Sequence, residues 1–430
     1  MNQKSHNNIP SLLTQAVRTI LLAGVALQGP TAFAASTDNN KDSNSLAAII
    51  SGNGQVLTYT HIADSANGFP EVFVHYLSTG KNTRVSVTPD GKKADGGSNL
   101  SSISSNGRYV AFDSQATNLV SGDSNSLTDI FVRDLKTRKT ERISIASDGV
   151  QANADSSLAA ISPDGRYVAF SSTASNLVKN DGNGAAADIF VHDRNSHETT
   201  RITSSDGTES DGQDEYPAIS EGGRFVAFTS DATNLVPGDT NKMPDIFVHD
   251  RETGETTRVS VASDGSEGNA PSLVATLSRD GRYIAFTSMA SNLVAGDTNN
   301  TWDAFIHDRK THQTTRISVA SDGTEGNADS KLPVIAANGT IVAFVSQADN
   351  LVKDDTNGKE DVFIHNLKSH RTTRLTTAFD GTDANGDSNY PSISDNGRFV
   401  AIESYASNLI PNDTDDAISD TFVADLKAKP

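Results

Sequence analysis

The sequence predicts an all-β fold, a seven-bladed β-propeller whose blades are four-stranded antiparallel sheets. The first observation is a turn followed by a strand, Asp280-Gly281-Arg282-Tyr283-Ile284-Ala285-Phe286, which recurs along the chain. The second is its spacing: the repeated glycines stand at 54, 107, 165, 223, 281, 339 and 397, and every step after the first is 58 residues. A fixed period of this length indicates a repeat architecture. The third is that each repeat contains four short strand patterns, which is the content of a propeller blade.

The copy over 264–322 illustrates one blade. Residues 273–278 and 283–288 are predicted to be its first and second strands, because β-branched and aromatic residues dominate both. Gly281 lies in the tight turn between them, where it can adopt φ > 0. Residues 303–308 and 315–320 are predicted as the third and fourth strands. In such a meander the short first–second and third–fourth turns share one face, and the long second–third loops and the links between blades share the other.

The two ends of the chain differ from the repeats. Residues 1–34 have the pattern of a secretory signal peptide: Lys4 and Arg18 precede the apolar run 19–27, and Ala32-Phe33-Ala34 offers small residues for cleavage. We therefore predict a leader over 1–34, a short polar segment over 35–44 and one propeller domain over 45–430. The sequence shows no fourth strand after Asp425, so it leaves open how the last blade is closed.

Composition limits the environment and the partners. The leader predicts an exported protein, periplasmic or secreted. Because the chain has no cysteine, we expect that it is not a lipoprotein and that it folds without disulfides. No apolar run outside the leader is long enough to span a bilayer, and we expect no membrane insertion. The formal net charge of −19 disfavours nucleic acid as a partner, because phosphate backbones repel an acidic surface. A monomer is expected.

The repeated motif also resembles a known family. Asp164-Gly165-Arg166-Tyr167-Val168-Ala169-Phe170, followed by residues 188–193 and by Thr200-Arg201-Ile202-Thr203, is similar to the WD40-like (PD40-type) repeat of TolB-like propellers. The resemblance covers roughly residues 45–430. It implies an exported propeller that binds other proteins or envelope polymers.

The long second–third loops contain spaced acidic trios. Oxygen ligands two and six residues apart on a turn can converge on a hard cation, which makes calcium a possible cofactor. The alternative is that each Asp and Asn caps backbone N–H groups of its own loop, and the trios lack the bidentate Glu of a calcium loop. The sequence does not decide between the two. The trios are Asp123, Asn125, Asp129; Asp239, Asn241, Asp245; Asp297, Asn299, Asp303; and Asp355, Asn357, Asp361.

Two further residue types recur at fixed places in the repeat. Histidines occupy one position of the third strand, and arginines end the fourth-strand motif. Equivalent positions on separate blades are far apart, so a metal ring is not expected. We predict interblade hydrogen bonds for both, with the arginines paired to third-strand carboxylates such as Asp193 and Asp250. The residues are His75, His192, His249, His307, His365, Arg142, Arg201, Arg258, Arg316 and Arg374.

Function is expected where the repeat breaks, at the mouth of the central channel on the long-loop face. An exposed aromatic among carboxylates and amides suits sugar stacking or a protein contact, although Trp302 could equally pack its own loop. We predict a non-catalytic binding or scaffold propeller for a protein or an envelope or extracellular polymer. Alternatives are a polysaccharide lyase or hydrolase, for which no paired acid and base is visible, and a calcium-stabilised lectin-like module. The candidate ligand residues are Asp155, Asp214, Glu215, Tyr216, Trp302, Asp329, Lys331, Asp387, Asn389 and Tyr390.

Overall fold

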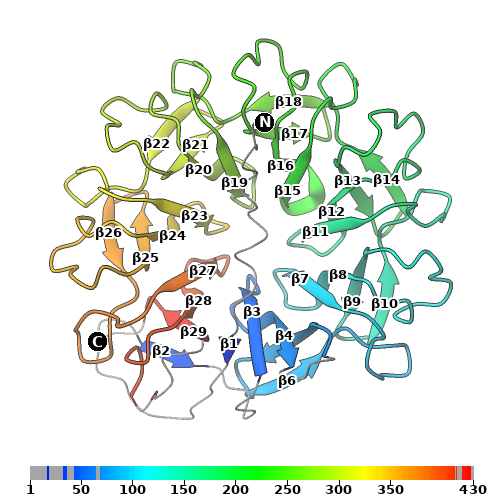
Figure 1. Cartoon of the computed structure of the whole chain (residues 1–430), viewed down its shortest axis with the longest axis horizontal. Coiled ribbons are helices and arrows are strands. Elements are labelled where there is room, and N and C mark those ends of the chain that lie inside the picture. The colour runs from blue at the N-terminus through cyan, green and yellow to red at the C-terminus, as the bar shows by residue number, and fades with distance from the viewer. Residues whose placement is uncertain are drawn as a thin grey trace, which may run out of the picture.

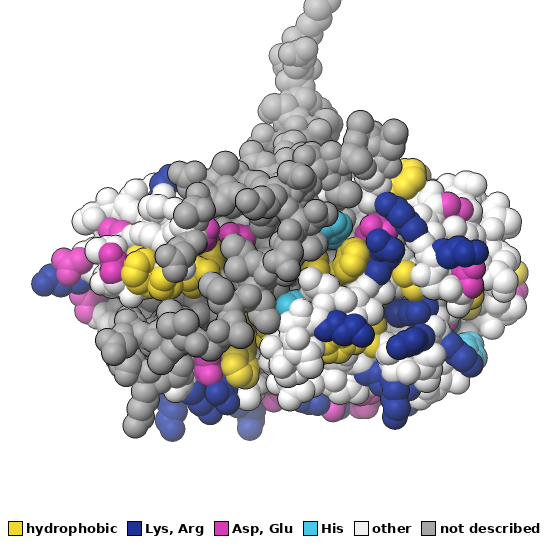
Figure 2. Space-filling view, turned by 90° about the horizontal axis from the view of Figure 1, so that it is seen from below, with side chains coloured by type: hydrophobic (Ala, Val, Ile, Leu, Met, Phe, Trp, Pro, Cys, Tyr) yellow, Lys and Arg dark blue, Asp and Glu magenta, His cyan; other side chains and the backbone are white. Residues whose placement is uncertain are grey.

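The computed structural model describes residues 17–18, 32–35, 43–63, 68–411, 413 and 419–427. Seven antiparallel sheets are arranged around a central axis, which confirms the seven-bladed propeller (Figure 1). Seen from its edge the molecule is a flattened disc, with Lys and Arg side chains on the lower rim and the right flank of the view (Figure 2).

Six blades have four strands in chain order, from the axis outward. Blades one to three are β3 (Ser43–Ile50), β4 (Val56–Ala63), β5 (Glu71–Tyr76), β6 (Lys81–Arg84); β7 (Ser98–Ile103), β8 (Tyr109–Ser114), β9 (Asp129–Asp134), β10 (Lys139–Arg142); and β11 (Ser156–Ile161), β12 (Tyr167–Ser172), β13 (Asp188–Asp193), β14 (Glu198–Arg201). Blades four to six are β15 (Asp214–Ile219), β16 (Phe225–Ser230), β17 (Asp245–Asp250), β18 (Glu255–Arg258); β19 (Ser272–Leu277), β20 (Tyr283–Ser288), β21 (Asp303–Asp308), β22 (Gln313–Arg316); and β23 (Ser330–Ile335), β24 (Ile341–Ser346), β25 (Asp361–Asn366), β26 (Arg371–Arg374).

Blade seven is assembled from both ends of the chain. Its inner three strands are β27 (Ser388–Ile393), β28 (Phe399–Ser404) and β29 (Ser419–Asp425). On the outer edge, β29 pairs with β2 (Ala32–Ala35) in antiparallel orientation and with the two-residue strand β1 (Val17–Arg18) in parallel orientation. The outer edge of blade seven is therefore completed by segments from the N-terminal side, which answers the question that the sequence left open.

Blade five compares closely with its prediction. The second and third strands, β20 and β21, have the predicted bounds, and β19 lies one residue earlier than predicted. The predicted fourth strand over 315–320 is wrong in extent, since β22 ends at Arg316. Beyond it Ile317 still donates to Ala304 O, at 2.8 Å, and Val319 then bridges to Glu325 as the chain turns into the link.

Helical structure is nearly absent from the described part of the chain. It is limited there to the single 3₁₀ turn η2 (Glu221–Gly223). None of the described helices has the length and apolar character that a bilayer crossing requires.

The repeated turn is fixed by its own side chains. Ser278 Oγ accepts the Tyr283 N–H at 3.0 Å, and Asp280 Oδ1 accepts the Arg282 N–H at 3.0 Å. Gly281 has φ 66°, and a Cβ there would lie 2.3 Å from Cδ2 of Phe225 in the preceding blade. Glycine is therefore required both by the turn and by the close packing of two blades.

The hydrophobic core lies between successive blades. One cluster joins Ile246 and Val248 of blade four to Ile284, Phe286 and Phe305 of blade five, all of them buried. Phe286 and Phe305 stack with ring centroids 5.8 Å apart, and the same stacked pair recurs in four other blades. Each blade therefore completes its core only against its neighbours.

On the short-turn face, the first–second turns bond to one another around the axis. The Arg279 guanidinium of blade five also pairs with Glu221 of blade four and, at 3.0 Å, with Asp395 of blade seven. On this face the turns of several blades are thus tied to one another by backbone hydrogen bonds and by an ion pair. The bonded backbone groups, N–H first, are Asn53 to Ser105, Ser105 to Pro163, Glu221 to Arg279, Arg279 to Ala337, Asn338 to Asp395 and Asp395 to Gly52.

Candidate functional site

The acidic trios converge on an arginine. In blade four, Arg258 Nη1 lies 3.4 Å from Asp239 Oδ1, 3.3 Å from Asp245 Oδ2 and 2.8 Å from Glu267 Oε1. Asp239 comes from the second–third loop, Asp245 begins β17, Arg258 ends β18, and Glu267 lies in the link to blade five. We call this group the outer socket of the blade. Its charges are nearly buried, and each is held by a different segment, so the socket ties the long loop and the link to the blade.

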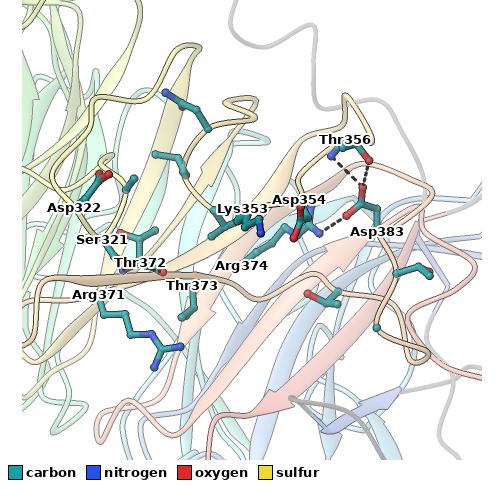
Figure 3. A pocket seen from close by; sticks show the side chains of 17 residues that line it. Ser321, Asp322, Lys353, Asp354, Thr356, Arg371, Thr372, Thr373, Arg374 and Asp383 are labelled. Atoms are coloured by element: carbon teal, nitrogen blue, oxygen red, sulfur yellow. Dashed lines mark hydrogen bonds and ion pairs between the residues drawn. The ribbon is translucent and has the colours of Figure 1, made fainter.

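The same outer socket recurs in four other blades with one variable member. The fourth group is a carboxylate or an amide at the position of Glu267, after the recurring Asp-Gly dipeptide. In blade six, Asp383 pairs with Arg374 and accepts hydrogen bonds from Thr356, beside a groove of about 1040 Å³ (Figure 3). The other sets are Arg142, Asp123, Asp129, Gln151; Arg201, Asp181, Asp188, Glu209; Arg316, Asp297, Asp303, Glu325; and Arg374, Asp355, Asp361, Asp383.

The asparagine of each trio makes capping bonds. Asn241 Nδ2 donates to Asp245 Oδ2 at 2.9 Å, and its Oδ1 accepts the Met243 N–H at 2.8 Å. Asn125, Asn299 and Asn357 make the corresponding bonds. The predicted calcium ligand set of Asp, Asn and Asp stays a prediction.

Three outer sockets have the composition of a metal site. In each of them three carboxylates offer oxygens that all lie within 4.8 Å of one another. Burial, together with the neighbouring carboxylates, raises the pKa of Asp239 and of Asp297 to about 6, although the arginine lowers it. These groups could hold a metal ion, but the guanidinium already supplies a positive charge at the same oxygens. The three groups are Asp181, Asp188, Glu209; Asp239, Asp245, Glu267; and Asp297, Asp303, Glu325.

The predicted partners of the repeated arginines were wrong in position. The socket arginines pair with the first residue of the third strand, whereas Asp193 and Asp250 end it. Asp193 instead pairs with Arg166 at 2.6 Å, and Asp250 with Arg224 at 2.7 Å. These pairs lie at the short turns, because the end of the third strand faces that side.

Four of the repeated histidines lie within hydrogen-bond distance of a threonine of their own blade. His192 Nδ1 lies 2.8 Å from Thr199 Oγ1, and Thr199 in turn donates to Ile145 O of the preceding blade at 2.6 Å. His249 also bonds to the backbone of Thr203, which follows blade three, so the predicted interblade bonds involve both the threonine and, in blade four, the histidine. Burial lowers the pKa of His192, His307 and His365 to about 4, so these rings are neutral at physiological pH.

The inner strands have a strained position that recurs in all seven blades. Each contains a β-bulge, and the residue in the bulge has positive φ although it is never glycine. Such a backbone costs roughly 1–3 kcal/mol per residue, most for β-branched Val274. We call these residues the inner ring, since their strands lie nearest the axis (Figure 1). They are Ala47, Leu100, Leu158, Tyr216, Val274, Leu332 and Tyr390, with φ between 37° and 58°.

The inner ring is held by side chains of the neighbouring blade. The Val274 N–H donates to Thr229 Oγ1 at 3.3 Å, and the Leu332 N–H donates to Thr287 Oγ1 at 3.2 Å. Beside Ala47, the Ala48 N–H donates to Glu403 Oε1 at 3.3 Å. Burial raises the pKa of Glu403 to about 7. The strained backbone is therefore fixed before any ligand arrives.

The predicted channel-mouth residues fall into two groups: some accept backbone N–H groups of the long loops, and the others lie on inner strands. Asp155, Asp329 and Asp387 accept backbone N–H groups that precede a third strand, at 2.8, 3.1 and 3.0 Å. The Trp302 N–H is one of these donors, and its side chain is half-buried. Lys331 Nζ lies 2.6 Å from Asp329 Oδ2. Each of these aspartates lies in the link before the first strand of its own blade, where it holds the long loop of the preceding blade.

The remaining candidates lie on two inner strands. Asp214 is fully buried, its Oδ1 accepts a hydrogen bond from Ser210 Oγ at 3.0 Å, and burial raises its pKa to about 8. Glu215 and Asn389 each precede a tyrosine of the inner ring, and Tyr390 is 38% exposed.

Sequence reasoning missed the aliphatic members of the inner ring and the fourth group of the outer sockets. Leucine and valine carry no sequence signal for positive φ. The Glu267 position did carry one, because an acid or amide follows the same Asp-Gly dipeptide in five blades.

The fold defines a class: an all-β, seven-bladed propeller of four-stranded blades. The structure is similar to an oligogalacturonate lyase from Vibrio parahaemolyticus, with TM-score 0.56 and 12% identity over 95% of this chain and 96% of that one. It is similar to the β-propeller domain of the trilobed protease from Pyrococcus furiosus, with TM-score 0.55 and 12% identity over 90% and 99%.

TolB from Acinetobacter baumannii aligns with TM-score 0.43 and 17% identity over 76% of this chain, and the chain spans 64% of its length. No family model and no curated protein matches the sequence. At these identities the comparisons establish the propeller fold, and the expected likeness to TolB-type propellers is confirmed at that level.

Proposed function

We propose that the protein is a non-catalytic binding propeller whose ligand enters the long-loop end of the channel and contacts the inner ring. The observation that supports this proposal is the inner ring. Its seven strained bulges share one backbone conformation and present different side chains around one axis. Strain of this kind persists where it positions groups for function. Bonds between the short turns tie the blades together on the opposite face, which supports placing the ligand on the long-loop face.

The chemistry of the ring fits a neutral polymer or an extended protein segment. Tyr216 and Tyr390 offer aromatic faces, with Glu215 and Asn389 next to them. Tyr405 lies close enough to Tyr390 to affect its titration, as does Glu360. Aromatic rings beside amides and carboxylates suit sugar stacking or a protein contact. Lys331, a neighbouring cation, is already paired, so a polyanion is the poorer fit.

The test is binding of the exported protein to panels of glycans and envelope proteins. Tyr390→Ala should weaken the best binder by at least about tenfold, in the range of an aromatic contact residue. Phe379→Ala is the matched control, because Phe379 is 42% exposed and lies outside the inner ring. Equal binding by the two variants would count against the channel site.

The second candidate is a polysaccharide lyase or hydrolase acting at the same mouth. Glu403 favours it: its pKa of about 7 is that of a proton donor near neutrality, and it lies beside two tyrosines. Product release from a polysaccharide by the wild-type protein, lost in Glu403→Gln, would support this alternative over simple binding.

Calcium binding at the outer sockets is a further proposal. The observation in its favour is that three carboxylates converge in each of blades four and five, and that burial raises the pKa of Asp239 and of Asp297 to about 6. Ligand linkage predicts a melting temperature that rises with calcium concentration. Asp297→Ala should shrink that rise, whereas Asp308→Ala should not. A melting temperature insensitive to calcium and chelator would leave arginine as the cation of the sockets.

The cellular location and the oligomeric state of the protein are also proposed. Leader cleavage near Ala34 would release a monomer into the periplasm or the medium. N-terminal sequencing of the exported protein and its mass in solution test both points.

A further inference from the structure

The outer edge of blade seven differs from all the others in the origin of its last strand. In blades one to six the fourth strand follows directly after the third. In blade seven that place is taken by β2, paired antiparallel over Ala32–Ala35 against Phe422–Asp425. The parallel pair of β1 with Ser419 and Asp420 lies on the same edge. The edge of β29 therefore accepts added strands in either direction.

The register of β2 is that of a regular fourth strand. Ala35 lies opposite Phe422, as Arg201 lies opposite Phe190 and Arg258 opposite Phe247. The position of Ala35 is therefore the position that carries arginine in the six other blades. Asp420 lies opposite Ser404 as Asp188 lies opposite Ser172, and Asp188 is where the socket arginine pairs.

This strand coincides with the predicted cleavage site. Cleavage near Ala34 would remove β1 and most of β2. Residues 35–42 would then be all that remains before β3. By comparison, the link between blades three and four alone takes residues 202–213. The processed chain is thus too short to supply both a link and a new fourth strand.

The ring itself does not depend on β2. The Ile50 N–H donates to Ser392 Oγ at 3.0 Å, and the Asp395 N–H donates to Gly52 O at 2.9 Å. Ile50 and Leu57 of blade one also share a buried cluster with Ala401 and Val423 of blade seven. Blade seven therefore stays attached to blade one through its inner strands while its outer edge is open.

We propose that export processing opens the outer edge of β29 and that this edge then binds an extended segment of a partner protein. The segment adds as an antiparallel fourth strand, with a basic residue at the position of Ala35. Unpaired strand edges pair readily with other chains, and strand addition is a general mode of peptide recognition. The inference rests on the proposed export.

The test compares two forms of the protein: the full chain made without export, and the protein recovered after export. The probe is a labelled peptide with the sequence of residues 197–204, which contains β14. The control peptide carries Thr200→Pro, because Thr200 pairs with Val191 and proline removes its N–H. The exported form should bind the probe at least about tenfold more tightly than the full chain, and neither form should bind the control.

Three results would overturn the proposal: an exported protein that still begins at Met1, equal probe binding by both forms, or no probe binding by the processed form. Ligand binding at the channel is measured on the same samples. If saturating probe leaves ligand binding at the channel unchanged, the edge of β29 and the channel are separate sites. A negative result at one site then does not contradict the proposal for the other.

Discussion

The outer sockets and the inner ring repeat in different ways. In the sockets the side chains recur: arginine meets aspartates in five blades at similar distances. In the inner ring the backbone recurs, while the side chain changes from alanine to leucine, valine or tyrosine. Constant side chains mark interactions that every blade needs in order to hold its loop. A constant backbone with varied side chains marks the surface on which the blades can differ. A ligand would be recognised at that surface.

The largest expected effect is at a socket. Arg258→Met should destabilise the protein by about 3–5 kcal/mol, because it leaves buried carboxylates without their cation. Denaturant unfolding at neutral pH measures it. The double variant Arg258→Met with Asp245→Asn should recover part of the loss. A loss within the range of a surface substitution would mean that the sockets do not hold the blades.

The dependence of stability on pH should come next. Burial raises the folded-state pKa of Asp113 and Asp188 to about 7 and that of Asp214 to about 8. Between pH 7.5 and 8.5 the folded state then binds more protons than the unfolded state, so stability should fall as pH rises. Each group that stays protonated contributes about 1.4 kcal/mol per pH unit.

The buried histidines act in the opposite direction near pH 6.5, because burial lowers their folded-state pKa while an unfolded histidine still binds protons there. Melting temperatures between pH 7.5 and 8.5, where the unfolded histidines are largely neutral, check the direction. Asp214→Asn should flatten the curve, and a melting temperature that rises over this interval would contradict the prediction.

A smaller effect of opposite sign is expected in the inner ring. Val274→Gly should stabilise the protein by up to about 1 kcal/mol, since glycine adopts φ 49° without strain. Val248→Gly is the control, because Val248 is buried in β17 and has no positive φ, so glycine there should destabilise. Similar losses in both variants would show that the ring side chain is needed for packing.

The smallest effect should come from an ion pair that is repeated but exposed. Arg224 pairs with Asp250 on the short-turn face and is 42% exposed, so Arg224→Ala should cost less than about 1 kcal/mol. Added salt should shrink the difference further. A loss as large as that of Arg258→Met would mean that repetition, and not burial, determines the contribution.

Much of the fold could be read from the sequence because the blades obey local rules. Glycine spacing gave the blade number, and β-branched runs placed β20 and β21. The sockets were predicted in part: Asp239 and Asp245 were found, but Glu267 lies in the next link, and only the fold brings it near. Closure by β2 was not predictable, because Ala32-Phe33-Ala34 reads locally as the end of a leader.

The interblade cores have a consequence for how the molecule comes apart. Most neighbouring blades share ten or more buried apolar residues, whereas the cluster between blades one and seven has four: Ile50, Leu57, Ala401 and Val423. A protease or a pulling force should therefore act first at this seam. The blades would then unwind in order from one free end, each losing its support as its neighbour leaves, as in a linear array of repeats.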